Sequence, residues 1–217
     1  MKRSILTTSL LLALATGSQA AVSLVQSYDL DTVFYQGPVP SGATYSLPSI
    51  EKTFQPFDST LGELEFAQIT WNITMEAQGT TGNSGGSVSF SFAPDVYVND
   101  IRYNGFGGGG GVGGPADTFV SDSDQETEES QFRATDTNSL YQQVWAVVTG
   151  SSEFTIEGFT LDEEFGSYQF FNSFSDAQVS LIDSSLTLTY SYTPVPEPSS
   201  SLLFSITSLW FFLRRRR

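Results

Sequence analysis

The sequence predicts an all-β protein, folded as a single antiparallel β-sandwich. Three observations favour this class: segments in which apolar and polar residues alternate, an abundance of aromatic residues with 18 Phe and 9 Tyr, and turn-forming residues clustered between those segments. Phe and Tyr suit the half-buried surface of a pleated sheet, and alternation with a period of two places every second side chain on one face. We therefore expect strands with one buried and one polar face.

The clearest strand spans residues 69–76, where four apolar residues alternate with Thr, Asn, Thr and Glu. Similar alternation predicts strands over residues 22–31, 87–92 and 186–192, and weaker patterns predict others near 141–149, 153–161 and 178–182. The apolar members of the clearest three patterns are Ile69, Trp71, Ile73, Met75, Val88, Phe90, Phe92, Leu186, Leu188, Tyr190 and Tyr192.

Turns are expected where Gly, Asn, Ser and Asp gather, at residues 79–86, 105–114 and 183–185. Because one-sided strands with polar outer faces bury their apolar faces against a second sheet, two sheets packed face to face follow. Alternation leaves the connectivity open between a jelly roll and an immunoglobulin-like sandwich.

The composition excludes several kinds of chemistry. The chain contains no Cys and no His, which removes disulfides, thiolate nucleophiles, most zinc sites and the usual general base. Between residues 21 and 193 there are three basic and 23 acidic residues, a net charge of −20. Such a field repels nucleic acid. We therefore expect no nucleic-acid partner and no enzymatic activity.

The N-terminus has the features of a secretory signal peptide over residues 1–20. Lys2 and Arg3 form the positive region, and residues 5–15 are largely apolar. Small residues follow, and cleavage between Ala20 and Ala21 fits the small-x-small rule. The apolar run is short for a membrane span, so the mature domain is expected to start at Ala21 and to occupy residues 21–193.

The last 24 residues, 194–217, form a second recognisable segment. Val195, Pro196, Glu197, Pro198 and Ser199 precede a mostly apolar stretch, and the chain ends in four arginines, Arg214, Arg215, Arg216 and Arg217. We expect a short transmembrane helix over residues 200–213. The apolar stretch with its preceding serines would be roughly 22 Å long as a helix, which is short for a hydrocarbon core of about 30 Å. The arginines would keep the C-terminus cytoplasmic.

This order of motif, apolar helix and basic end resembles the PEP-CTERM sorting signal of Gram-negative bacteria. The resemblance implies that an integral-membrane protease, an exosortase, recognises the motif and removes the helix. It implies export through the inner membrane, transient membrane attachment, and a final location outside the cell or on the cell envelope.

A second resemblance concerns the domain. Residues 57–64, Phe-Asp-Ser-Thr-Leu-Gly-Glu-Leu, precede the clearest strand and are similar to the start of choice-of-anchor E domains, over roughly residues 54–192. These are β-rich bacterial surface domains found ahead of various sorting tails. The glycine run and the acidic segment depart from that family's usual middle. The resemblance implies an architecture and no particular chemistry.

Two segments resemble binding sites. The glycine run at 107–114 lacks the Lys-Ser/Thr and the following helix of a phosphate loop, so we expect a flexible surface loop. Asp122, Asp124 and Glu126 have the alternating carboxylates that calcium prefers. An EF-hand is excluded because its sixth and twelfth positions hold Thr127 and Arg133. A solvated acidic loop is the expectation, with a calcium site of another kind as the alternative.

The expected function is a structural or adhesive role at the cell surface or in an extracellular polysaccharide matrix, without a resident cofactor. A calcium-dependent carbohydrate-binding module is the alternative, in which aromatics such as Tyr97, Tyr103 and Phe106 would contact sugars. A polysaccharide hydrolase would need a carboxylate pair, for which residues 162–164 are candidates.

Overall fold

The structure, a computed structural model, describes residues 20–159 and 164–195. Residues Val22–Val195 form one compact unit. Ala20 and Ala21 are exposed, directly before the first strand. Residues 1–19 and 196–217, with most of the expected signal peptide and sorting tail, lie outside the described residues. Within the described ranges, no helix is long and apolar enough to cross a membrane.

The first layer of the sandwich is built around one 20-residue strand, β5 (Gly62–Thr81). One edge of β5 pairs along its length with β10 (Phe119–Phe132), and the other edge pairs first with β14 (Ser185–Pro194) and then with β13 (Phe174–Leu181). Outside these lie β1 (Val22–Asp29) on β14 and β2 (Thr32–Val39) on β13. All pairings are antiparallel.

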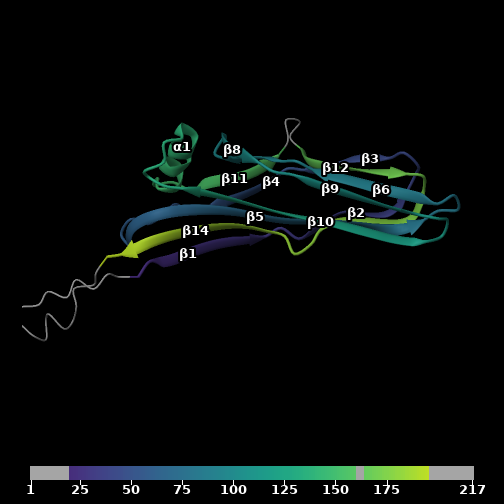
Figure 1. Cartoon of the computed structure of the whole chain (residues 1–217), viewed down its shortest axis with the longest axis horizontal. Coiled ribbons are helices and arrows are strands. Elements are labelled where there is room, and N and C mark those ends of the chain that lie inside the picture. Colours follow the sequence, from purple (N-terminus) through teal and green to yellow (C-terminus); the bar gives the residue numbers. More distant parts are fainter. Residues whose placement is uncertain (1–19, 160–163, 196–217) are drawn as a thin grey trace, which may run out of the picture. The chain divides into compact units, whose positions relative to one another are not determined.

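The second layer faces the first and consists of two four-stranded sheets placed end to end (Figure 1). One has the order β4 (Ile50–Phe54), β11 (Phe154–Phe159), β7 (Asp95–Val98) and β8 (Ile101–Gly105). The other has the order β3 (Thr44–Pro48), β12 (Glu164–Phe171), β6 (Gly86–Phe92) and β9 (Gly108–Gly114). Corresponding strands are continuations of one another along the chain, with short breaks such as Ser49 and Ala93–Pro94.

The core lies between these layers and confirms the predicted alternation. Ile69, Trp71, Ile73 and Met75 of β5 are each at most 1% exposed, while the residues between them are half-buried. The inward residues of β6 and β14 are also buried, each at most 4% exposed: Val88, Phe90, Phe92, Leu186, Leu188 and Tyr190. The all-β sandwich is therefore confirmed, as are the strands predicted near 22–31, 153–161 and 178–182.

The strand predicted at 141–149 is wrong, because α1 (Ser139–Val148) occupies it. Its aromatic and β-branched residues indicated a strand, but Tyr141, Val144 and Val148 also recur at helical spacing. The Asn138 side chain accepts a hydrogen bond from the Leu140 backbone NH, 2.9 Å away, and caps the helix. Val144 and Val148 are buried, and tertiary packing thus overrides strand propensity.

Two loop predictions are also wrong. The glycine run is an edge strand, β9, and the acidic segment is part of the 14-residue strand β10. β9 shows no alternation of apolar and polar residues because glycine has no side chain. β10 shows none because its inward positions hold carboxylates in place of apolar side chains. The turn predicted at 79–86 is narrower, since Gly79 belongs to β5 and Gly86 to β6.

Candidate functional site

One lateral side of the sandwich is closed by side chains that join the two layers. β10 borders the first layer and β9 borders the second. The Oδ2 atom of Asp122 accepts a hydrogen bond from the Gly111 NH at 2.8 Å, and the Oδ2 atom of Asp124 accepts one from the Gly109 NH at 2.7 Å. We call these four residues the seam. Carboxylates thus replace the backbone partners that the β9 edge would otherwise lack.

Further along the same side, the amide of Asn104 in β8 donates to Glu128 of β10 and, at 3.3 Å, to the hydroxyl of Ser130. Asp122, Asp124, Glu126 and Glu128 occupy alternate, half-buried positions on the inner face of β10. The row of acids predicted to be a solvated loop therefore contributes to the contact between the layers.

The seam explains why β9 consists mostly of glycine. A Cβ at Gly110 would lie 2.6 Å from Asp122 Oδ2 and 2.7 Å from the Phe90 ring, and one at Gly109 would lie 2.7 Å from the Phe90 carbonyl oxygen. Distances below about 3 Å are too short for a Cβ. Only glycine lets β9 approach both β6 and β10 so closely.

The structure places the predicted metal ligands on one strand but does not gather them. Asp122 and Asp124 are engaged with backbone NH groups of β9, and Glu126 lies two residues further along β10. Across residues 20–159 and 164–195, no group of three or more Asp, Glu, His or Cys residues is arranged to hold a metal ion. Calcium binding at Asp122, Asp124 and Glu126 stays a prediction.

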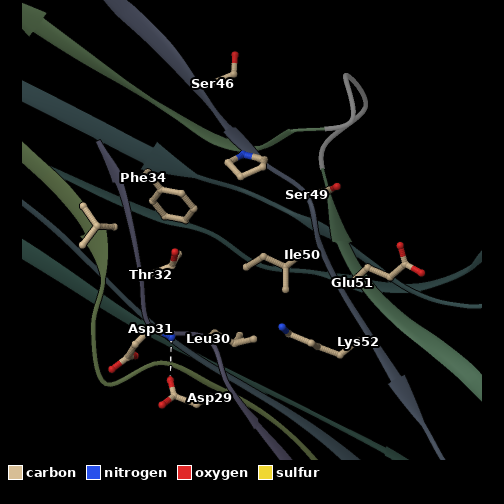
Figure 2. A pocket seen from close by; sticks show the side chains of 12 residues that line it. Asp29, Leu30, Asp31, Thr32, Phe34, Ser46, Ser49, Ile50, Glu51 and Lys52 are labelled. Carbon is tan, nitrogen blue, oxygen red and sulfur yellow. Dashed lines mark hydrogen bonds between the residues drawn. The ribbon is translucent and has the colours of Figure 1, made fainter. Parts of the chain in front are cut away.

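The opposite lateral side contains a hollow of about 550 Å³. It forms where the edge strands of both layers are interrupted: between β1 and β2 at Leu30–Asp31, and between β3 and β4 at Ser49. Phe34 from β2 and Ile50 and Lys52 from β4 point into it from its two sides (Figure 2). Its volume is in the range of small-molecule sites.

The carboxylates at the hollow are held by hydrogen bonds across the strand breaks. The Asp29 side chain accepts a hydrogen bond from the Asp31 NH at 2.8 Å, as the dashed line in Figure 2 shows. Asp31 in turn accepts one from the Ser184 NH at 2.7 Å. Ser184 is 3% exposed, and its hydroxyl accepts from the Thr74 NH at 2.9 Å. This network fixes the two aspartates at the rim.

The lining of the hollow is both apolar and polar. Leu30, Phe34 and Ile50 supply apolar surface, and Asp29, Asp31, Glu51 and Lys52 supply charges of both signs. Hydroxyl groups come from Thr32, Ser46 and Ser49. Such a lining can pack against the C–H face of a polyhydroxy ligand and hydrogen-bond to its hydroxyl groups.

Two of the aromatics predicted to contact sugars, Tyr103 and Phe106, line a separate open pocket of about 590 Å³, but most of each ring is covered by the core. Tyr103 is 7% exposed, and its hydroxyl accepts a hydrogen bond from Trp71 Nε1 at 3.1 Å. Burial raises the pKa of Tyr103, so the phenol stays neutral. Phe106 is partly buried and packs 6.1 Å from Trp71 between ring centroids. Tyr103 is therefore a core residue and Tyr97 of β7 is half-buried, and contact of these aromatics with sugars stays a prediction.

Residues 162 and 163, two of the candidate carboxylates for hydrolysis, lie outside the described residues. The residues of the hollow were missed because they come from two segments that look like ordinary strand ends. The only sequence signals were the Leu30–Asp31 interruption and Pro48–Ser49.

No protein-family model matches the chain, and no curated protein does. Among solved structures, a chain from infectious bursal disease virus strain Gx has 10% identity and a TM-score of 0.26, with 90% of this chain and 50% of that chain covered. The VP2 subviral particle of the same virus gives 10% identity and a TM-score of 0.15, with 99% and 54% covered. The chain thus spans about half the length of these viral chains, and the likeness is too low to carry an argument.

Proposed function

We propose that this chain is an exported, non-enzymatic protein of the bacterial cell surface or extracellular matrix, sorted through its C-terminal motif by an exosortase-type membrane protease. The observation that carries this proposal is the position of the two domain ends. β1 begins at Val22, just after the expected cleavage site at Ala20–Ala21, and β14 ends at Pro194, just before the motif that starts at Val195.

The two ends also lie side by side. β1 and β14 are antiparallel neighbours in which Val22 is paired with Tyr192. The chain therefore enters and leaves the domain at the same end of two neighbouring strands. A domain arranged in this way can be exported by an N-terminal signal peptide and then held at the membrane by a C-terminal helix. Its core does not need either segment in order to fold.

The proposed architecture is a jelly roll. When continuous strands are counted as one, the first layer has the order β1–β2, β13–β14, β5 and β10, and the second has the order β3–β4, β11–β12, β6–β7 and β8–β9. Consecutive strands thus alternate between layers, except that β6–β7 and β8–β9 are neighbours in the second layer, an order found in jelly-roll domains with two Greek keys. This connectivity supports a rigid, disulfide-free body suited to an exposed location.

The sorting proposal is tested with the full-length protein in its native host. We expect Glu197→Ala to leave most of the protein in the membrane fraction with its tail attached, because the acid between the two prolines is the part of the motif that a protease can recognise by charge. The control, Glu129→Ala, also removes one acidic side chain, from the exposed face of β10. It should leave the membrane as the unaltered protein does. An unchanged distribution of Glu197→Ala would contradict the proposal.

Binding of uncharged polysaccharide at the hollow is a second candidate function, favoured by the apolar side chains of Leu30, Phe34 and Ile50 in its lining. We expect Phe34→Leu, which keeps the packing but removes the ring, to weaken binding of neutral oligosaccharides about tenfold, or roughly 1.4 kcal/mol. The control Phe119→Leu alters an exposed ring on β10. Calorimetry in EDTA and in calcium separates this candidate from its calcium-dependent form. No binding of a broad panel of neutral glycans in either buffer would sink it.

A further inference from the structure

The folded domain reaches directly to the sorting motif. Pro194 is still paired with Gly62 in the sheet, and the NH of Val195, the first residue of the motif, donates to the Leu61 carbonyl oxygen at 3.0 Å. Val195 is thus both the first residue of the motif and a hydrogen-bonding partner of the folded domain. An enzyme that holds the motif must therefore touch the last residues of the sheet.

The surface around this point exposes apolar side chains. Val22 is 43% exposed, Leu24 36%, Leu61 38% and Val195 57%. We call these four residues the exit surface. Val22 and Leu24 are the sheet partners of Tyr192 and Tyr190, and the Leu61 carbonyl accepts a hydrogen bond from the Val195 NH. All four residues therefore lie beside or directly after the last five residues of β14, 190–194. Exposed apolar side chains gathered at one place mark a contact with another molecule.

The charge around the exit surface favours a protein over a lipid surface. Residues 22–28 contain no Asp, Glu, Lys or Arg, although the domain as a whole carries −20. Exposed Glu63 and Glu65 follow directly on β5 and would repel anionic lipid headgroups. A partner that must come to this point in any case, and that is itself embedded in the membrane, is the protease.

We propose that the exit surface is a docking surface for the membrane-embedded sorting protease, which reads the folded end of the domain together with the motif. This inference rests on the proposed function. Apolar contacts between the protease and Leu24 and Leu61 would position the motif and slow its release from the protease. A misfolded domain would not hold these residues beside Val195 and would therefore be processed poorly.

The test follows tail removal by pulse-chase with the full-length protein in its native host. We expect Leu24→Ser with Leu61→Ser to slow tail removal about tenfold, the effect of roughly 1.4 kcal/mol of lost contact. The matched control is Phe119→Ser with Phe171→Ser, which removes two side chains that are 60% and 46% exposed on other strands. It should be processed at the rate of the unaltered protein.

A second variant leaves every side chain of the domain in place. Ten Gly/Ser residues inserted between Pro194 and Val195 would separate the motif from the exit surface, and we expect slower tail removal here too. Equal rates for all variants would overturn the docking proposal while leaving sorting intact. Unprocessed protein in every case, the unaltered chain included, would instead overturn the sorting proposal. Slower removal in both double variants alike would also overturn docking, because it would indicate a general effect of lost apolar surface.

Discussion

Replacing Gly110 with valine is expected to destabilise the domain by about 3 kcal/mol or more, at the upper end of overpacking effects. The first atom of any side chain at this position would already lie 2.6 Å from Asp122 Oδ2 and 2.7 Å from the Phe90 ring. Because β9 is confined between β6 and β10, it cannot move away from one without losing hydrogen bonds to the other. The seam bond from Asp122 to Gly111 should be lost as well.

The measurement is urea unfolding of the isolated domain, residues 21–195, which the structure shows as one compact unit. The control is Ser121→Val, which adds the same side chain at an exposed position of β10 and should change the free energy of unfolding by less than about 0.5 kcal/mol. If Gly110→Val unfolded at the same urea concentration as the control, β9 would not be packed as described.

Replacing Trp71 with alanine is the second large effect that we expect, at about 4 kcal/mol, typical of a large aromatic removed from a core. Trp71 has no exposed surface and is the largest fully buried side chain of the described residues. Its loss would leave a cavity beside Phe106 and would remove the donor to the Tyr103 hydroxyl. A buried hydroxyl without its partner adds to the cost.

A milder substitution separates these contributions. Trp71→Phe removes the indole NH and part of the volume, and we expect it to cost about half as much as alanine. Trp145→Phe, in the partly buried face of α1, should cost less than either. The free energies of unfolding from urea titration give this order. A Trp71→Ala domain as stable as Trp145→Phe would contradict the assignment of Trp71 to the centre of the core.

The sequence predicted β5, β6 and β14, whose apolar inner residues alternate regularly over several positions. It did not predict β2, β3, β4, β7, β8 or β12, although their buried residues include Leu47, Phe54 and Phe170, and it also missed β9 and β10, whose inner faces are not apolar. The strand over residues 69–75 was predicted because every second residue is apolar, and the structure shows that these residues are buried. The sequence predicts a loop in place of β10 because acids occupy its inner positions. Two of them, Asp122 and Asp124, accept hydrogen bonds from backbone NH groups of β9. No local pattern reveals such a partner, since it lies on a strand that carries no side chains.

The hollow was beyond sequence reasoning for a related reason. Phe34 and Ile50 come from different layers, and they meet only because the breaks at Leu30–Asp31 and Ser49 coincide in space. The limits of the domain, residues 21–193, stay a prediction from the sequence. The acidic segment with alternating apolar and polar residues ends where the proline-flanked motif starts. The last sheet pairing, Pro194 with Gly62, lies at that boundary.

The most direct test of the central claim is the intact mass of the protein recovered from its native envelope, in a strain with the sorting protease and in one without it. The account predicts a chain that starts at Ala21 in both strains. It predicts a C-terminus at or near residues 195–199 where the protease is present, and at Arg217 where it is absent. The same C-terminus in both strains would contradict the claim that the tail is a processed sorting signal.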